Sequence, residues 1–109
     1  MVEPRPAYSI VTEAELLSFA EQLSWSVARR EQAVFLLTYF DRIGIEDNKI
    51  IQAYVMLDTY SRQVLKGSRK MGKNDLWIAA TAYAIGAVIV TTDKDFEHLQ
   101  GKYITQIMV

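Results

Sequence analysis

Apolar and polar positions in the first half of the chain predict helices joined by short extended segments. Thr12 and Glu15 form a capping-box pair that indicates the start of a helix, directly after a β-prone run over residues 8–11. Apolar residues at helical spacing predict a second helix over 30–42. A third helix is expected to begin at Asp47, which is a suitable N-terminal cap.

The second half of the chain changes from a helical pattern to a strand pattern at Gly86. Alanines precede this glycine and β-branched residues follow it, which predicts a helix over 74–85 and a buried strand over 87–91. A short acidic turn over 93–99 and a last strand over 103–109 complete the pattern. The chain therefore alternates helices with short apolar strands.

This alternation predicts the fold class. Continuous apolar strands that alternate with helices indicate a mostly parallel sheet covered on both faces, so we expect an α/β fold. The chain shows no internal repeat, low-complexity tract or Gly/Ser linker, and we expect a single domain over 1–109.

Composition and charge exclude several classes of protein. The chain has 109 residues, half of them hydrophobic, with no Cys and one His, so neither disorder nor a disulfide or zinc scaffold is expected. A net charge of −1 gives no global positive field, and contact with nucleic acid would need a local patch. The charge-free segment around Gly86 is broken, and we see no signal peptide, so we expect a cytoplasmic protein and no membrane span.

Three acidic residues are expected at one edge of the sheet. A helix that follows a strand begins at the carboxyl edge of the sheet, and Glu15 lies one turn into such a helix. Asp75 opens a helix about as long as the strand that follows it, so Asp93, just past that strand, should return to the same edge. Converging carboxylates suit Mg²⁺ or Mn²⁺, and such an ion favours metal-assisted hydrolysis of nucleic acid.

Each acid also has a purely structural interpretation. Glu15 fits the third position of a capping box, and Asp75 would be stabilised by the dipole of its own helix. Asp93 and Asp95 lie in an acidic turn, where Asp is common. Only the expected convergence argues for a site.

A cluster of basic residues precedes Asp75. It could contact RNA phosphates, or it could be a solvated loop. Its members are Lys66, Arg69, Lys70 and Lys73. His98 is expected to be exposed on the segment that follows Asp95.

Four segments of the chain form a distinctive set. They are Gly72-Lys73-Asn74-Asp75-Leu76-Trp77-Ile78-Ala79-Ala80-Thr81-Ala82, then Gly86-Ala87, then Thr91-Thr92-Asp93-Lys94-Asp95-Phe96, and near the N-terminus Ser9-Ile10-Val11-Thr12-Glu13-Ala14-Glu15-Leu16. Together they resemble the PIN domain family. The resemblance implies a three-layer α/β fold and a metal-dependent ribonuclease. Many members are toxins of the VapBC type, inhibited by a small antitoxin.

The resemblance also implies roles for individual residues. Glu15, Asp75 and Asp93 correspond to the second, third and fourth acids of the family, which are catalytic and bind the metal. Asn74 and Thr91 fall where the family has polar neighbours of the metal, in reach of RNA together with Lys70 and Lys73. Asp95 is either an extra metal ligand or a cap of the short segment before Phe96.

The family's first strand, of the form hydrophobic-Leu-Asp-Thr, has no counterpart at the N-terminus. The resemblance therefore implies a truncated PIN domain that lacks the first central strand and its metal acid, with impaired activity. The same motif occurs at Val55-Met56-Leu57-Asp58-Thr59. This segment continues a helical face, so we expect Asp58 to be a helical residue. An open sheet edge predicts a homo-oligomer, formed by strand pairing or exchange. The alternative function is an inactive remnant that serves as an oligomerisation or antitoxin-binding module.

Overall fold

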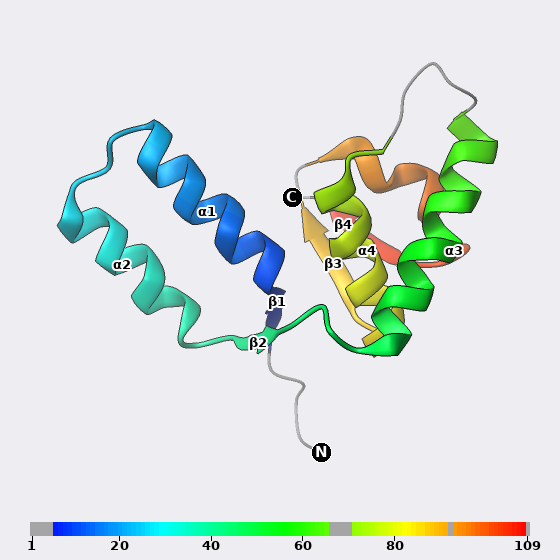
Figure 1. Cartoon of the computed structure of the whole chain (residues 1–109), viewed down its shortest axis with the longest axis horizontal. Helices are drawn as coiled ribbons and strands as arrows, with labels where there is room; N and C mark the ends of the chain where they lie inside the picture. The colour runs from blue at the N-terminus through cyan, green and yellow to red at the C-terminus, as the bar shows by residue number, and fades with distance from the viewer. Residues whose placement is uncertain (1–5, 66–70, 92, 109) are drawn as a thin grey trace. The chain divides into compact units, whose positions relative to one another are not determined.

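The computed structural model describes residues 6–65, 71–91 and 93–108 (Figure 1). Contacts within the chain divide it into two compact units, residues 1–44 and residues 45–109. Each unit contains a pair of parallel strands and at least two helices.

The first unit is a helical hairpin closed by two short strands. Strand β1 (Ala7–Ser9) leads directly into α1 (Ile10–Gln22), and α2 (Val27–Leu37) returns the chain to β2 (Asp41–Ile43). The two strands pair in parallel. A crossover of two helices between parallel strands is typical of an α/β unit.

The first helix begins earlier than the sequence pattern predicts. Ser9, not Thr12, is the N-terminal cap, because its hydroxyl accepts a hydrogen bond from the backbone N–H of Val11 at 3.1 Å. The expected capping box is therefore wrong, and Glu15 lies beyond the first turn of α1. Ser and Thr are both strong caps, and the pairing of β1 with β2 ends the strand at Ser9.

The second helix is also displaced from its expected range of 30–42. It begins after Ser26, whose hydroxyl accepts a hydrogen bond from the N–H of Arg29 at 3.1 Å, and it ends at Leu37. The last two residues of the expected helix, Asp41 and Arg42, instead belong to β2, where the backbone pairs with β1. Tertiary pairing has here overridden the local helical pattern.

The second unit packs two helices beside a second parallel strand pair. In chain order it consists of α3 (Asn48–Leu65), α4 (Lys73–Ile85), β3 (Val88–Thr91), the 3-10 helix η1 (Lys94–Leu99) and β4 (Thr105–Met108). Strands β3 and β4 run parallel, with η1 between them in sequence. The expected α/β class with parallel strands is confirmed, and the expected acidic turn is a 3-10 helix.

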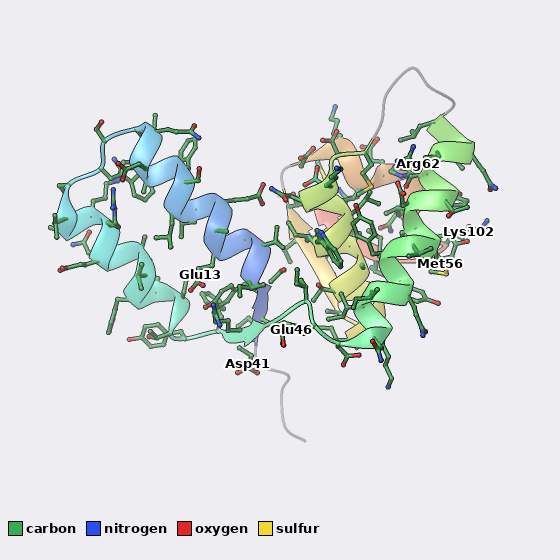
Figure 2. All side chains as sticks on the ribbon, in the orientation of Figure 1. Glu13, Asp41, Glu46, Met56, Arg62 and Lys102 are labelled. Atoms are coloured by element: carbon green, nitrogen blue, oxygen red, sulfur yellow. The ribbon has the colours of Figure 1, made fainter. Side chains whose placement is uncertain are left out.

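Several local predictions for this unit are confirmed. Asp47 precedes α3, and its carboxylate accepts a hydrogen bond from the N–H of Lys49 at 2.7 Å. Gly86 ends α4 in the left-handed conformation, with φ of 68°. Asp58 is a helical residue whose carboxylate lies 3.0 Å from Nε of Arg62, one turn later on α3. Figure 2 labels Arg62 on this helix.

The core of the second unit lies between α3, α4 and η1. Leu57, Leu76 and Leu99 come one from each of these elements and are completely or almost completely buried. The rings of Tyr54 and Trp77 add an aromatic contact between α3 and α4, with centroids 4.2 Å apart. Burial of these large side chains is the main stabilising contribution to this unit.

Across the part of the chain that the structure describes, none of the helices is both long enough and apolar enough to cross a membrane. The segment around Gly86 is divided between α4 and β3, as the sequence pattern predicts.

Candidate metal centre

Asp75 is presented by the first turn of α4. This helix begins after Gly72, which caps it without a side-chain hydrogen bond. The backbone N–H groups of the first turn give the start of a helix a partial positive charge, which stabilises a carboxylate there. Asp75 is half-buried, beside the fully buried Leu76. The core contact of Leu76 therefore fixes the turn that carries the carboxylate.

Asp93 is held at the junction between β3 and η1 by three hydrogen bonds. Its N–H donates to the hydroxyl of Thr91 at 3.0 Å, and its carbonyl accepts from the side-chain amide of Gln106 at 2.9 Å. Its carboxylate caps η1 by accepting from the N–H of Asp95 at 2.9 Å. Thr91, at the end of β3, thus acts on the backbone that carries Asp93.

The carboxylates of Asp75, Asp93 and Asp95 come together. One oxygen from each lies within 4.8 Å of the others, a spacing that fits a shared metal ion. Three like charges at this spacing repel one another unless a cation or helix N-termini offset them. The donor set consists of hard carboxylate oxygens, partly exposed to solvent, and it fits Mg²⁺ or Mn²⁺ better than a softer metal.

The residues expected to contact RNA lie partly within and partly outside the described part of the chain. Lys73 and Asn74 are exposed on the first turn of α4, next to Asp75 in sequence. Lys70 lies outside the described residues, as do Lys66 and Arg69. Their contact with RNA stays a prediction.

Glu15 lies on α1, in the first compact unit, and its side chain is exposed. The three aspartates belong to the second unit. The participation of Glu15 in the metal site therefore stays a prediction.

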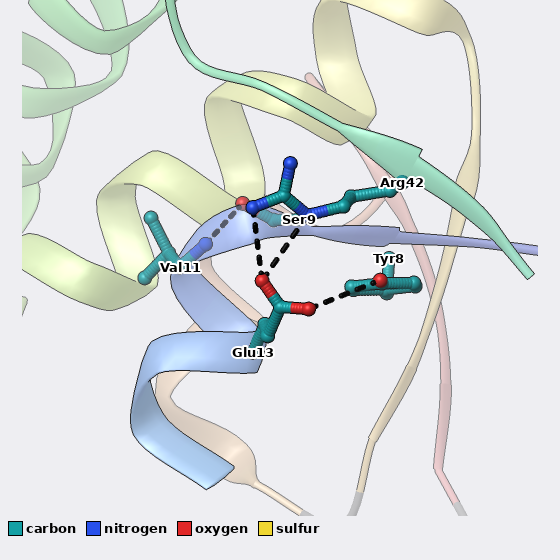
Figure 3. Close-up of polar contacts among 5 residues, drawn as sticks. All are labelled: Tyr8, Ser9, Val11, Glu13 and Arg42. Carbon is teal, nitrogen blue, oxygen red and sulfur yellow. Dashed lines mark hydrogen bonds and ion pairs between the residues drawn. The ribbon is translucent and has the colours of Figure 1, made fainter. Parts of the chain in front are cut away.

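The first unit contains a different carboxylate interaction, at Glu13. Its Oε2 accepts two hydrogen bonds from Arg42, at 3.0 and 3.1 Å, and its Oε1 lies 3.5 Å from the hydroxyl of Tyr8 (Figure 3). Tyr8 and Arg42 are directly opposite each other in the β1–β2 register. Glu13 therefore joins the first turn of α1 to both strands, a structural role that sequence reasoning did not anticipate.

His98 is not the exposed residue expected from the sequence. Its ring is partly buried, and its Nε2 lies 2.7 Å from the hydroxyl oxygen of Ser61, which is 2% exposed on α3. Burial lowers the pKa of His98, against the opposing effects of a hydrogen bond with the backbone of Asp95 and of the charge of Asp95. The only sequence signal for this contact was a serine at an inward position of an otherwise apolar helical face.

Comparison with known proteins identifies the family of this arrangement. The PIN domain profile matches residues 3–102. The chain belongs to the PIN domain family. Among curated proteins, Ribonuclease VapC4 of Mycobacterium tuberculosis is 36% identical over 90 residues, which cover 81% of this chain and 66% of that protein. This PIN domain chain therefore spans just under two thirds of the length of that relative.

Solved structures agree with the PIN domain fold. VapBC-1 from nontypeable Haemophilus influenzae has a TM-score of 0.75 at 27% identity, covering 99% of this chain and 78% of that chain. VapBC-5 from M. tuberculosis, a member of a family of toxin–antitoxin systems, has a TM-score of 0.70 at 26% identity, covering 94% and 81%. A toxin–antitoxin complex from Klebsiella pneumoniae shares the fold, with a TM-score of 0.69 at 24% identity over 98% and 76%.

Proposed function

We propose that this protein is a metal-dependent endoribonuclease of the PIN family and the toxin of a toxin–antitoxin pair. The observation that carries the proposal is the convergence of the Asp75, Asp93 and Asp95 carboxylates. The similarity to a relative named as a ribonuclease supports the choice of RNA as substrate.

The three aspartates would hold Mg²⁺ or Mn²⁺, with Glu15 as a further acid. A bound divalent cation would lower the pKa of a water molecule and stabilise negative charge on a phosphodiester oxygen. The protein's own contribution is to fix the ligands before the substrate arrives. Thr91 and Gln106 hold the backbone of Asp93, and the first turn of α4 holds Asp75.

Contact with RNA is assigned to residues near the same helix start. Lys73 and Asn74 are exposed and precede Asp75 directly, so a phosphate near the metal would be within reach of a cation and an amide. Lys70 and Thr91 complete the proposed set. A Lys73→Ala substitution should reduce the slope of log K for RNA binding against log salt concentration by about one, as expected for the loss of one phosphate contact.

A cleavage assay with matched variants tests the activity. We expect the purified chain to cleave single-stranded RNA in Mg²⁺ or Mn²⁺, to lose activity in EDTA, and to lose it by at least tenfold in Asp75→Asn. Asp58→Asn is the control, because Asp58 is an aspartate of the same unit that pairs with Arg62 on α3. Cleavage that survives both EDTA and Asp75→Asn would refute the proposal. Metal binding without cleavage would favour the alternative, an inactive module that binds an antitoxin or a second copy.

We also propose two protein partners. An antitoxin is supported by the VapBC toxin–antitoxin structures that the fold resembles. Expression of this chain should arrest cell growth. A neighbouring gene that relieves the arrest when it is co-expressed would identify the antitoxin.

Self-association is supported by β3, which within the described part of the second unit pairs only with β4 and so leaves one edge open. Light scattering after size exclusion should give a dimer or larger species. A monomer at all concentrations would contradict self-association.

A further inference from the structure

A hydrogen bond joins α3 to η1, the short helix that follows Asp93 in the sequence. Ser61 is 2% exposed, and its hydroxyl oxygen lies 2.7 Å from Nε2 of His98. His98 is in the last turn of η1, the same short helix that Asp93 caps and that carries Asp95. The interaction therefore joins the most buried polar group of α3 to the element that carries one of the three carboxylates and is capped by another.

The His98 ring is held from several sides. Besides the Ser61 contact, it forms a hydrogen bond with the backbone of Asp95, one turn earlier. The ring of Tyr60 lies parallel to it, with an interplanar angle of 8° and a centroid distance of 6.5 Å. The hydroxyl of Ser61 is also 3.7 Å from the sulfur of Met71. One imidazole thus connects α3 to the backbone of a carboxylate that belongs to the cluster.

Apolar packing and a directional hydrogen bond both hold η1. Phe96 and Leu99 anchor this helix in the core, being 3% and 0% exposed. Such contacts are non-directional and tolerate small rotations of a short 3-10 helix, whereas a hydrogen bond at 2.7 Å is directional. A rotation of η1 would move the carboxylate of Asp95 relative to that of Asp75 on α4.

We propose that the Ser61–His98 hydrogen bond is a positioning device that holds η1 so that Asp93 and Asp95 converge with Asp75 on one divalent cation. The proposal rests on the metal site of the proposed function. Ser61 and His98 are positioning residues, because they act through the backbone of η1. Nε2 can accept the Ser61 hydroxyl proton when the imidazole carries its hydrogen on Nδ1.

Metal affinity of the full chain tests this proposal without relying on RNA cleavage. We expect Ser61→Ala and His98→Phe to weaken Mn²⁺ binding, measured by titration with electron paramagnetic resonance, by about tenfold. Thr59→Ala is the matched control, because it removes a hydroxyl from an exposed position of the same helix. Circular dichroism establishes that each variant is folded, and His98→Phe carries the test if Ser61→Ala does not fold.

A spectroscopic signature separates positioning from general destabilisation. His98 is the only histidine of the chain, so long-range ¹H–¹⁵N correlation spectra of untagged protein report its tautomer without ambiguity. We expect one tautomer in the wild-type chain and in Thr59→Ala, and a mixture in Ser61→Ala. Unchanged Mn²⁺ affinity in a folded Ser61→Ala variant whose tautomer has changed would overturn the proposal, as would a wild-type chain that binds no Mn²⁺. Wild-type Mn²⁺ binding without RNA cleavage would instead refute only the proposed ribonuclease.

Discussion

The carboxylate of Asp93 accepts a hydrogen bond from the backbone N–H of Asp95, with 2.9 Å between Oδ1 and N. Both carboxylates also belong to the cluster with Asp75. Asp93 therefore has two separable functions: it caps η1, and it contributes negative charge to the candidate metal centre. Asn can perform the first function but supplies no charge for the second.

Two substitutions at Asp93 should separate these functions. Asp93→Asn keeps an oxygen for the Asp95 N–H, whereas Asp93→Ala leaves that N–H without its partner, so the free energy of unfolding should be about 1 kcal/mol lower for Ala than for Asn. Both variants should lose Mn²⁺ affinity. Urea denaturation without metal and Mn²⁺ titration are the two measurements. Equal stability of the two variants would show that the cap contributes nothing.

Gly86 should resist substitution because of its backbone conformation alone. Its φ is 68°, and an added Cβ would meet no atom within 4 Å, so Gly86→Ala should cost about 1 kcal/mol through backbone strain. Gly44 is the control, since a Cβ there also meets nothing and its φ is not positive. Gly44→Ala should change the free energy of unfolding by less than about 0.5 kcal/mol. A similar cost at both positions would contradict this explanation.

Leu57 should be among the most sensitive core positions. It is 0% exposed on α3, and Leu57→Ala should cost about 2–5 kcal/mol by removing buried surface and leaving a cavity. Val55 lies on the same helix but is 60% exposed, so Val55→Ala should cost less than about 1 kcal/mol. Chemical denaturation followed by circular dichroism measures both changes. A loss for Leu57→Ala no larger than that for Val55→Ala would be inconsistent with the observed core.

The Glu13–Arg42 pair should contribute modestly and in a salt-dependent way. The Arg42 side chain is 54% exposed and that of Glu13 is 23% exposed, so solvent screens the pair although its geometry is good. A double-mutant cycle with Glu13→Gln and Arg42→Ala should give a coupling free energy of about 0.3–1 kcal/mol. The coupling should fall as NaCl is raised to about 0.5 M. A coupling that does not respond to salt would indicate packing of the arginine stem instead.

Local signals in the sequence were sufficient for much of the second unit. The change from alanines to β-branched residues at Gly86 predicted where α4 ends and β3 begins, and Asp47 and Asp58 have the helical roles expected of them. These features depend on neighbouring residues only, through capping, positive φ and helical spacing. The approach of Asp75 and Asp93 also followed from local lengths, because α4 and β3 carry the chain across the sheet and back.

Features that depend on contacts between distant parts of the chain were predicted wrongly. The strand pairing of β1 with β2 decided that Ser9 and not Thr12 caps α1, and it converted the end of the expected second helix into a strand. His98 was expected to be exposed because nothing near it in sequence indicates Ser61, which is 37 residues away.

The sequence by itself therefore determined the α/β class, the order of most elements and the aspartates that meet at one edge. Only the tertiary structure decided that Asp95 joins those aspartates through the turn of η1, and that a buried serine and a partly buried histidine connect η1 to α3. The physical reason is that a helix or a cap is stabilised by contacts within a few residues. The orientation of a short helix such as η1 is instead set by whichever distant side chains surround it.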